Sequence, residues 1–519
     1  MKVNLSSLFL IIDYGKIFFM QNNSNVSLPE DFRGVHIHFV GIKGTGMAAL
    51  VEILFHKGAV ITGSDVSERF YTDEVLEKLG LHALPFGASN ITDDIQYVIY
   101  SSAYKLDKNP DLIEATRRGV PCLLYTQALG AYSERAYSCG VCGVHGKTST
   151  TGLTGTILKE IDLPSQVLAG SVINSFGGTC TYTAPMMTDK ASIFVAETCE
   201  YQRHFMSFCP QKIILTSVEP DHEDYYPTYE DIRQAFIDYI CKLPQGGEVI
   251  YCADDKGACD TVNIVQGLRP DIIMIPYGEK ASGDFSVKFG KVENERNCFT
   301  LGLFAEKGEF ALSMPGRHEV LDAAAAVALV CRLLVTAGKN PLEYYENIRR
   351  GLLNFSGGKR RSEIVGRFKN QKGADVIVLD DYGHHPTAVK TTLEGYREFY
   401  KGRKIIVDFM SHTYSRTQAL LPEFAKCFKA ADEVILHKIY SSARENPADF
   451  DITGRTLYEA VLATGQKNVS YYEEILDAAD FAMAELEKPL GPEYPDGYLF
   501  ITMGAGDNWK LGKKILENK

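Results

Sequence analysis

The stretch from Tyr137 to Thr151, YSCGVCGVHGKTSTT, decides the fold of this chain. An apolar strand-like run ends at Cys142, a glycine-rich turn follows, and a helical pattern begins directly after the turn. Such a turn presents backbone N–H groups at a helix N-terminus, where phosphate groups bind, and Lys147 adds a positive charge. Val141 stands where the usual phosphate loop has its leading glycine, so this is a shorter Gly-x-x-Gly-Lys-Thr form. We expect a nucleoside triphosphate site; the alternative, a surface turn with a solvated lysine, fits the flanking strand and helix poorly.

Acidic and imidazole side chains follow two further strand-like runs. Glu197 ends one apolar run, and His222 lies just beyond another run that begins at Ile214. The carboxyl ends of parallel strands meet at one edge of a sheet, where ligands bind. The Thr148 hydroxyl and the Glu197 carboxylate are oxygen ligands of the kind that Mg²⁺ prefers. An isolated glutamate at a strand end is more often solvated, but the neighbouring phosphate loop favours a magnesium site.

Strand-like runs and helical patterns alternate along almost the whole chain. This alternation predicts βαβ units, parallel sheets and the α/β class. A length of 519 residues exceeds what one hydrophobic core supports, so about three domains are expected. We predict a poorly ordered extension at 1–33 and domains at 34–135, 136–357 and 358–519. Short alternating strands between about 275 and 315 predict an antiparallel appendage on the middle domain.

Composition excludes several function classes. The formal net charge of −12 argues against a broad nucleic-acid surface, which needs an excess of Lys and Arg. No uncharged apolar run reaches the ~18 residues of a membrane-spanning helix, and Asp13 and Lys16 interrupt the most apolar N-terminal segment. The 12 cysteines are spread widely, which indicates reduced thiols in a cytoplasmic protein. Cys139 and Cys142 form one CxxC pair without a second pair, so we expect buried strand cysteines instead of a zinc site.

A second glycine-rich loop, from Val40 to Met47, has the sequence VGIKGTGM and follows a strand-like run. It opens an apolar helix, and Asp65 lies about 20 residues beyond it, at the end of the next strand. The glycines allow a tight turn and the close approach of a pyrophosphate, and Asp65 would bind a ribose hydroxyl. This pattern suits a nicotinamide cofactor, a flavin or a nucleotide sugar. It also occurs in close-packed turns that bind no ligand.

Polar residues crowd the C-terminal third of the chain. Lys359-Arg-Arg361 would ordinarily be a solvated basic patch, but beside a domain boundary a guanidinium can reach the γ-phosphate. The segment Asp380 to Pro386, DDYGHHP, follows a buried strand with two carboxylates, a phenol and two imidazoles. Those groups suit amine recognition or proton transfer, and the alternative is a purely structural turn.

The order of these motifs resembles that of the Mur ligases of peptidoglycan synthesis, from about residue 34 to residue 515. Asp380 to Pro386 and Gly504 to Asp507 are similar to the muramate-recognising branch, in particular to the ligases that join L-alanine to UDP-N-acetylmuramate. The other segments that carry the resemblance are His36 to Met47, Gly63 to Asp65, Ser101 to Ala103, Gly146 to Thr148, Glu197, Glu219 to Asp224, Gly316 to His318, Lys359 to Arg361 and Tyr414 to Thr417.

The resemblance implies three domains: an N-terminal Rossmann-like domain for the UDP-sugar, a central P-loop ATPase with a mostly parallel sheet, and a C-terminal Rossmann-like domain for the amino acid. It implies ATP and Mg²⁺ as cofactors and UDP-N-acetylmuramate and L-alanine as substrates. The lactyl carboxylate would attack the γ-phosphate, and the amine would then displace phosphate from the acyl phosphate. Alternatives are a related ligase that adds another amino acid or a preformed peptide, a non-catalytic nucleotide-sugar-binding regulator, and an oxidoreductase, which the phosphate loop disfavours.

The resemblance also implies roles for residues of all three domains. The implied catalytic residues are Lys147, Glu197, His222, Arg361, Asp381 and His385, with Asp381 or His385 as the proton acceptor for the amine. The implied ATP-binding residues are Gly143, His145, Gly146, Lys147, Thr148, Ser149, His318, Asp322 and Arg360. The implied UDP-sugar-binding residues are Gly41, Gly44, Thr45, Gly46, Asp65 and Ser102, and the implied metal ligands are Thr148, Glu197 and His222.

Several positions depart from the family pattern. Lys43 replaces a glycine and would either add charge to the pyrophosphate or point outward. Glu319 and Asp322 replace two asparagines; because carboxylates only accept hydrogen bonds, the change bears on nucleotide preference. Cys199 stands at a position that is commonly Asp. The segment 408–413, DFMSHT, differs from the usual Gln-Pro-His-Arg run, which bears on amino-acid specificity.

Overall fold

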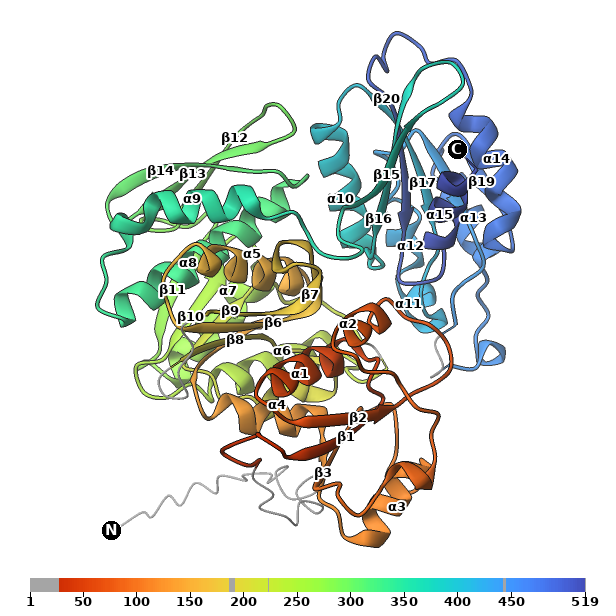
Figure 1. Cartoon of the computed structure of the whole chain (residues 1–519). Helices are drawn as coiled ribbons and strands as arrows, with labels where there is room; N and C mark the ends of the chain where they lie inside the picture. Colours follow the sequence, from red (N-terminus) through yellow and green to blue (C-terminus); the bar gives the residue numbers. More distant parts are fainter. Residues whose placement is uncertain (1–27, 186–191, 223, 442–444, 519) are drawn as a thin grey trace, which may run out of the picture.

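The computed structural model describes residues 28–185, 192–222, 224–441 and 445–518, and Figure 1 shows how their elements are arranged. Three larger sheets packed with helices follow one another along the chain, together with one small sheet, and the predicted α/β class is confirmed. The predicted boundaries near residues 135 and 357 fall in the connections between sheets. No helix in these ranges is long and apolar enough to cross a membrane.

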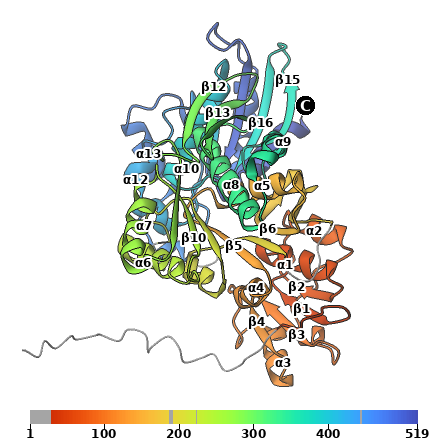
Figure 2. The same ribbon diagram turned by 90° about the vertical axis from the view of Figure 1, so that its left-hand side faces the viewer.

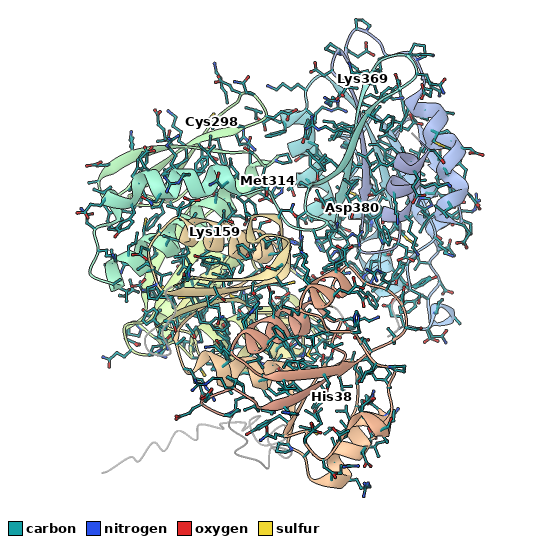
Figure 3. The ribbon with its side chains drawn as sticks, viewed as in Figure 1. His38, Lys159, Cys298, Met314, Lys369 and Asp380 are labelled. Atoms are coloured by element: carbon teal, nitrogen blue, oxygen red, sulfur yellow. The ribbon has the colours of Figure 1, made fainter. Side chains whose placement is uncertain are left out.

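The first sheet has the strand order β2-β1-β3-β4, and its strands are parallel. Its strands are β1 (His36–Val40), β2 (Val60–Ser64), β3 (Tyr97–Tyr100) and β4 (Cys122–Leu124), and its helices are α1 (Thr45–His56), α2 (Asp73–Lys78), α3 (Pro110–Arg118) and α4 (Tyr125–Ser133). α3 begins at Asn109, whose side chain accepts hydrogen bonds from two backbone N–H groups, and ends at Gly119 in the left-handed conformation. His38 on β1, labelled in Figure 3, is buried with its Nε2 3.2 Å from Oδ1 of Asp111 on α3.

The predicted extension at 1–33 covers residues 1–27, which lie outside the described residues, and a short segment that packs onto the first part of the chain. Leu28 and Phe32 are almost fully buried. The Arg135 guanidinium donates to the carbonyls of Leu28 and Pro29 and lies 5.5 Å from the centre of the Phe32 ring. Residues 28–33 are therefore packed and not a loose extension, because two apolar side chains and an arginine hold them in place.

The central sheet has the order β11-β10-β9-β5-β8-β6-β7, parallel except for β7, which runs antiparallel to β6. Its strands are β5 (Tyr137–Cys142), β6 (Ser165–Ile173), β7 (Thr179–Thr183), β8 (Ile193–Glu197), β9 (Lys212–Leu215), β10 (Glu248–Cys252) and β11 (Ile273–Tyr277). Its helices are α5 (Lys147–Lys159), α6 (Tyr229–Ile240), α7 (Lys256–Leu268), α8 (Arg317–Thr336) and α9 (Tyr345–Asn354). β5 pairs with β8 on one side and β9 on the other, so the ends of these three strands share one edge.

A small antiparallel sheet of β12 (Val287–Val292), β13 (Asn297–Leu303) and β14 (Glu306–Leu312) follows the central sheet, in the region predicted to hold an antiparallel appendage. β13 alternates between buried and half-buried residues, the pattern of a strand with one face on a core. Phe299 of β13 and Phe310 of β14 stack on the buried face of this small sheet, and β13 packs against α8.

The third sheet has the order β15-β16-β20-β17-β18-β19, parallel except for β15. Its strands are β15 (Glu363–Lys369), β16 (Asp375–Asp381), β17 (Arg403–Phe409), β18 (Glu433–Leu436), β19 (Val469–Tyr471) and β20 (Gly497–Met503). Its helices are α10 (Pro386–Phe399), α11 (Tyr414–Ala419), α12 (Leu421–Phe424), α13 (Gly454–Ala463), α14 (Ala479–Leu486) and α15 (Trp509–Glu517). Residues of α10, α12 and α13 share one buried cluster on the sheet, and residues of α14 and α15 share another.

The first and central parts of the chain are joined by a broad packed interface. α1 lies against β6 and β7, and Figure 2 shows α1 next to β6. Glu52 of α1 is buried in this interface, and burial raises the pKa of its carboxyl. The C-terminal part, blue in Figure 1, stands beside the central part and meets it through loops at strand ends. The site described next lies where these loops come together.

Candidate functional site

The phosphate loop connects β5 to α5 at the carboxyl edge of the central sheet. Gly143 (φ 130°) and Gly146 (φ 78°) have positive φ angles, which favour glycine. A Cβ on Gly146 would lie 2.4 Å from Oδ1 of Asp322, so α8 approaches the loop closely. The His145 N–H donates to Oγ of Ser217 at 3.0 Å. These contacts leave the backbone of the loop little freedom.

Lys147 folds back over the loop. Its Nζ donates to the carbonyls of Gly143 (2.5 Å) and Val144 (3.2 Å) and lies 3.1 Å from Oε2 of Glu200, which is buried. Nε2 of His222 is 3.3 Å from Oε1 of the same Glu200, so one carboxylate joins the lysine to the imidazole. Burial alone would raise the pKa of Glu200, but Lys147 and His222 lower it overall, and the carboxylate is ionised.

Thr148 and Glu197 come together beside the loop. Oγ1 of Thr148 donates to Oε2 of Glu197 at 2.9 Å, and the Gly170 N–H donates to the same oxygen at 2.8 Å. The lone pairs of the Thr148 hydroxyl therefore remain available, and this hydroxyl and carboxylate are a donor set that fits Mg²⁺. His222, the third predicted ligand, contacts Glu200 in this structure.

Two carboxyl groups of α8 adjoin the phosphate loop. Oγ of Ser149 donates to Oε1 of Glu319 at 3.0 Å, and both Glu319 and Asp322 are buried. Burial raises the pKa of Glu319 to about 7, and burial together with Glu319 raises the pKa of Asp322 well above its usual range. Protonated carboxyls both donate and accept hydrogen bonds, so this pair can present the hydrogen-bonding pattern of amides. Nε2 of His318 lies 4.0 Å from Oε1 of Glu319.

The first glycine loop differs from the sequence-based expectation at Lys43. Its Nζ donates to the carbonyls of Val66 (3.0 Å) and Glu68 (2.8 Å) and lies 3.3 Å from Oδ1 of Asp73, with the side chain 7% exposed. The expectation that Lys43 points outward was therefore wrong, and its contribution of charge to a pyrophosphate stays a prediction. Two carbonyls and a carboxylate lie within reach of its ammonium group, so it is paired inside the protein.

Asp65, the predicted ribose ligand, is also engaged within the protein. Its carboxylate accepts hydrogen bonds from the N–H groups of Lys43 (2.7 Å) and Val66 (2.8 Å) and from the Tyr104 hydroxyl (3.2 Å). The other predicted sugar-nucleotide residues line the same end of the sheet: Gly41 packs against Tyr104, Gly44 precedes α1, Thr45 shares a 2.7 Å hydrogen bond with Tyr71, Gly46 faces Tyr125, and Ser102 is exposed.

A cavity of about 190 Å³ lies between the first glycine loop and Glu197, one of the predicted metal ligands. Gly46 and Tyr125 line it from the first part of the chain, and Glu197 lines it from the central part. Most of the remaining wall is apolar, from side chains such as Leu168 and Phe205. A ligand that bound at the first loop could thus extend through this cavity toward Glu197.

The C-terminal basic and acidic clusters pair with each other. Arg360 donates from Nε to Oδ2 of Asp380 (2.8 Å) and from Nη2 to the Gly504 carbonyl (2.6 Å). The Arg361 guanidinium lies 5.4 Å from the centre of the Tyr382 ring. The electrostatic influence of Arg361 extends to the acidic pair of α8. Arg361 is therefore the arginine of this segment that influences the acidic pair of α8, while Arg360 holds the C-terminal part together.

The carboxylate of Asp381 accepts hydrogen bonds from groups of its own domain. Its carboxylate accepts hydrogen bonds from the N–H groups of Ser362 (2.8 Å) and Gly383 (2.8 Å) and from the Tyr396 hydroxyl (3.1 Å). A carboxylate that accepts three hydrogen bonds from its own part of the chain is held in a fixed orientation. This geometry favours a positioning role for Asp381.

Arg416 ties the C-terminal part to the loop that carries His222. Its Nη2 lies 2.7 Å from Oδ1 of Asp221, and both side chains are 7% exposed. Burial would raise the pKa of Asp221, but Arg416 lowers it far below its usual range, so the pair is ionised. The Asp221 carboxylate also accepts the His222 N–H at 2.7 Å. The position of His222 thus depends on contact between the two parts.

His145, Glu219 and His385 form a second cluster between the central and C-terminal parts. Nε2 of His145 is 3.6 Å from Oε2 of Glu219, and the rings of His145 and His385 are 5.1 Å apart. Their possible ligand atoms lie within 4.8 Å of one another, the spacing of a metal site. However, Nδ1 of His385 accepts the Thr387 N–H at 3.3 Å, so its Nε2 carries the proton and offers no lone pair. We therefore treat this cluster as a hydrogen-bonding site.

Comparison with known proteins agrees with this arrangement. Three family models match consecutive parts of the chain: "Mur ligase family, catalytic domain" at residues 36–137, "Mur ligase middle domain" at 141–330 and "Mur ligase, glutamate ligase domain" at 360–506. The chain belongs to the Mur ligase family. The predicted resemblance is confirmed, and the three matched segments follow the order of the three larger sheets.

Individual relatives match almost end to end. A UDP-N-acetylmuramate--L-alanine ligase of Treponema pallidum is 46% identical over 491 residues, which cover 94% of this chain and 98% of that protein. The same enzyme of Borreliella burgdorferi is 36% identical over 481 residues, 92% of this chain and 97% of that protein. The solved UDP-N-acetylmuramate-alanine ligase of Thermotoga maritima has a TM-score of 0.71 at 23% identity, covering 93% of this chain and 98% of that one, and shares its fold.

Three residues at the site were not predicted as functional from the sequence. Glu200 joins Lys147 to His222, Glu219 faces His145, and Arg416 holds Asp221. Glu219 and Arg416 belong to segments that carried the family resemblance, so a role could have been sought there. Glu200 follows Glu197 by three residues, and no spacing rule distinguishes which carboxylate meets the lysine.

Proposed function

We propose that this protein joins L-alanine to the lactyl carboxylate of UDP-N-acetylmuramate, with hydrolysis of ATP to ADP and phosphate, in peptidoglycan precursor synthesis. The observation that carries the proposal is the cavity that runs from Gly46 to Glu197. A sugar nucleotide held at the first loop would place its carboxylate next to the phosphate loop. The near full-length identity to relatives of this name supports the same reaction. The free thiols of its cysteines suit the cytoplasm, where we place the reaction.

The chain's own residues can perform the first step. Lys147, freed from its loop carbonyls, and Arg361 would neutralise charge on the γ-phosphate while the lactyl carboxylate attacks it. Thr148 and Glu197, with His222 nearby, would hold Mg²⁺, which supplies further charge neutralisation when bound. The resulting acyl phosphate needs protection from water, and the buried Arg416–Asp221 pair favours the closed arrangement that excludes it.

A second candidate is a ligase of the same family that adds a preformed peptide. A pocket of about 640 Å³ lies at the carboxyl edge of the third sheet, lined by Met410, Tyr414, Tyr440, Asp507 and Lys510. That volume exceeds the needs of an alanine side chain, and it adjoins the divergent segment 408–413. The amino-acid assay below distinguishes this candidate from the first.

The test is an assay with ATP, Mg²⁺, UDP-N-acetylmuramate and a panel of amino acids and peptides. We expect phosphate release that requires both UDP-N-acetylmuramate and L-alanine, together with a product whose mass equals the sum of the two minus water. Product with a peptide but not with L-alanine would support the second candidate. Phosphate release that is independent of the UDP-sugar, or binding of the UDP-sugar without turnover, would contradict both.

A further inference from the structure

His145 has two separable parts, a backbone that belongs to the phosphate loop and an imidazole that faces away into another cluster. Its N–H donates to Ser217, and its carbonyl accepts from the Thr216 hydroxyl, so the backbone is fixed against the segment that directly follows β9. Its Nε2 is buried and has no hydrogen-bond partner among the residues that the structure describes. A fixed, buried and unsatisfied imidazole nitrogen indicates a group that a ligand completes.

His385 contributes a second unsatisfied nitrogen to the same space. Its side chain is 5% exposed, and its Nε2 also lacks a partner among the described residues. Because Nδ1 accepts the Thr387 N–H at 3.3 Å, Nε2 of the neutral ring is a donor. Burial, assisted by His145, lowers the pKa of His385 to about 4, so the ring is neutral at neutral pH. His385 can therefore donate a hydrogen bond to a ligand, but it cannot take a proton from one.

Glu219 supplies negative charge to this cluster. Oε2 of Glu219 lies 3.6 Å from Nε2 of His145 and accepts the Thr387 hydroxyl at 3.2 Å. The neighbouring His145 lowers the pKa of Glu219, while burial opposes that shift, and the net effect keeps the carboxylate ionised. The other titratable groups that face His145 are Asp255, beyond β10, and His318 on α8. An imidazole beside a carboxylate, with one N–H donor from His385, together suit the amino and carboxylate groups of an amino acid.

We propose that Nε2 of His145 takes the proton from the attacking amino group, with Glu219 stabilising the imidazolium that forms. The proposal rests on the ligase function proposed above. One proton moves from the ammonium of the amino acid to Nε2 of His145, and the nitrogen lone pair then forms the C–N bond to the acyl carbon. The C–O bond to phosphate breaks, its electron pair leaves with phosphate, and phosphate takes the second proton. The cluster lies beside the phosphate loop, where that carbonyl would be formed.

The assignment moves the proton-acceptor role from the C-terminal part to the phosphate loop. Asp381 has three hydrogen-bond donors already, and His385 holds its proton on the nitrogen that faces the site. Asp381 therefore positions its neighbours, and His385 donates a hydrogen bond to the ligand. Since His145 and His385 lie on different parts of the chain, the acceptor and its neighbouring donor meet only when those parts are in contact.

The test separates the two chemical steps with His145→Gln. Hydroxylamine is largely unprotonated at neutral pH and needs no proton acceptor, so it traps the acyl phosphate as a hydroxamate. We expect His145→Gln to lower L-alanine ligation about 100-fold while hydroxamate formation with ATP and UDP-N-acetylmuramate stays within about threefold of wild type. The ligation rate of the variant should keep rising with pH where that of wild type has levelled. His82→Gln, at an exposed position, is the matched control.

Glu219→Gln provides a second, independent variant. We expect about a tenfold loss of ligation, because the imidazolium loses its neighbouring anion, while hydroxamate formation stays near that of wild type. Parallel loss of ligation and hydroxamate formation in His145→Gln would overturn the proposal, since the histidine would then serve only the phosphate loop. Unchanged ligation would overturn it as well. If wild type formed no hydroxamate with UDP-N-acetylmuramate, the ligase function itself would fail.

Discussion

The two glycine loops of this protein start alike and end differently. Each leaves a parallel strand, turns through glycines of positive φ and enters a helix, at Gly41 in the first and at Gly143 and Gly146 in the second. In the first loop, Lys43 donates hydrogen bonds to the carbonyls of Val66 and Glu68. The carboxylate of Asp65 accepts a hydrogen bond from the backbone N–H of Lys43. In the second, Lys147 rests on carbonyls of its own loop and on an ionised Glu200.

The difference shows that a lysine in a glycine loop has no fixed role. Lys43 donates hydrogen bonds to the carbonyls of Val66 and Glu68 and thereby holds the segment 66–73 against the first loop. Both lysines contact two carbonyls and a carboxylate, but the carbonyls that Lys147 contacts belong to its own glycine loop, whereas those that Lys43 contacts belong to a separate segment. We therefore assign Lys43 to loop structure and Lys147 to phosphoryl transfer.

The largest effect should follow from removing Lys147. We expect Lys147→Ala to lower kcat by about 10³-fold or more, because the ammonium group that neutralises negative charge on the transferring phosphoryl group is removed. Binding of UDP-N-acetylmuramate, measured by calorimetry, should change little. Lys159→Ala, in the last turn of the same helix, is the control and should keep full activity. Equal loss of turnover and sugar-nucleotide binding would mean that the two loops do not have separate roles.

A smaller and different effect is expected at the first loop. Lys43→Met removes the ammonium that joins the loop to the carbonyls of Val66 and Glu68, so the segment 66–73 should lose its fixed position. We expect KM for UDP-N-acetylmuramate to rise about tenfold while kcat changes less than about threefold, since the phosphoryl-transfer residues are untouched. Initial-rate kinetics measure both quantities, with Lys105→Met at an exposed position as the control. A fall in kcat at unchanged KM would place Lys43 in the chemical step.

The smallest effect concerns the carboxyl pair beside the second loop. Burial raises the pKa of Glu319 to about 7 from 4.5, and Arg361 and Asp381 are the charged groups that also act on it. Between these two values the native state keeps a proton that the unfolded chain releases, so stability falls as pH rises through this window. Glu319→Gln should therefore raise the melting temperature by a few degrees at pH 8 and hardly at all at pH 4.5. Scanning calorimetry at both values tests this, and Glu306→Gln on β14 should show no such dependence.

Much of the architecture could be predicted because it depends on local patterns. The strand, glycine turn and helix at residues 137–151 require only hydrophobic periodicity and residues that tolerate positive φ. The alternation of such units fixes the α/β class, and the motif order indicates the family. Leu28 and Phe32 escaped prediction, since their burial depends on Arg135, about a hundred residues away.

The sequence by itself determined the order of the sheets, the phosphate loop and the set of polar residues at the strand ends. Only the tertiary structure decided which partners they take. Lys43 is paired with the segment 66–73, Glu200 joins Lys147 to His222, and His145 meets Glu219 and His385 across two parts of the chain. Periodicity and turn preferences act between near neighbours along the chain, whereas hydrogen bonds and ion pairs depend on distances that arise only after distant strands have packed.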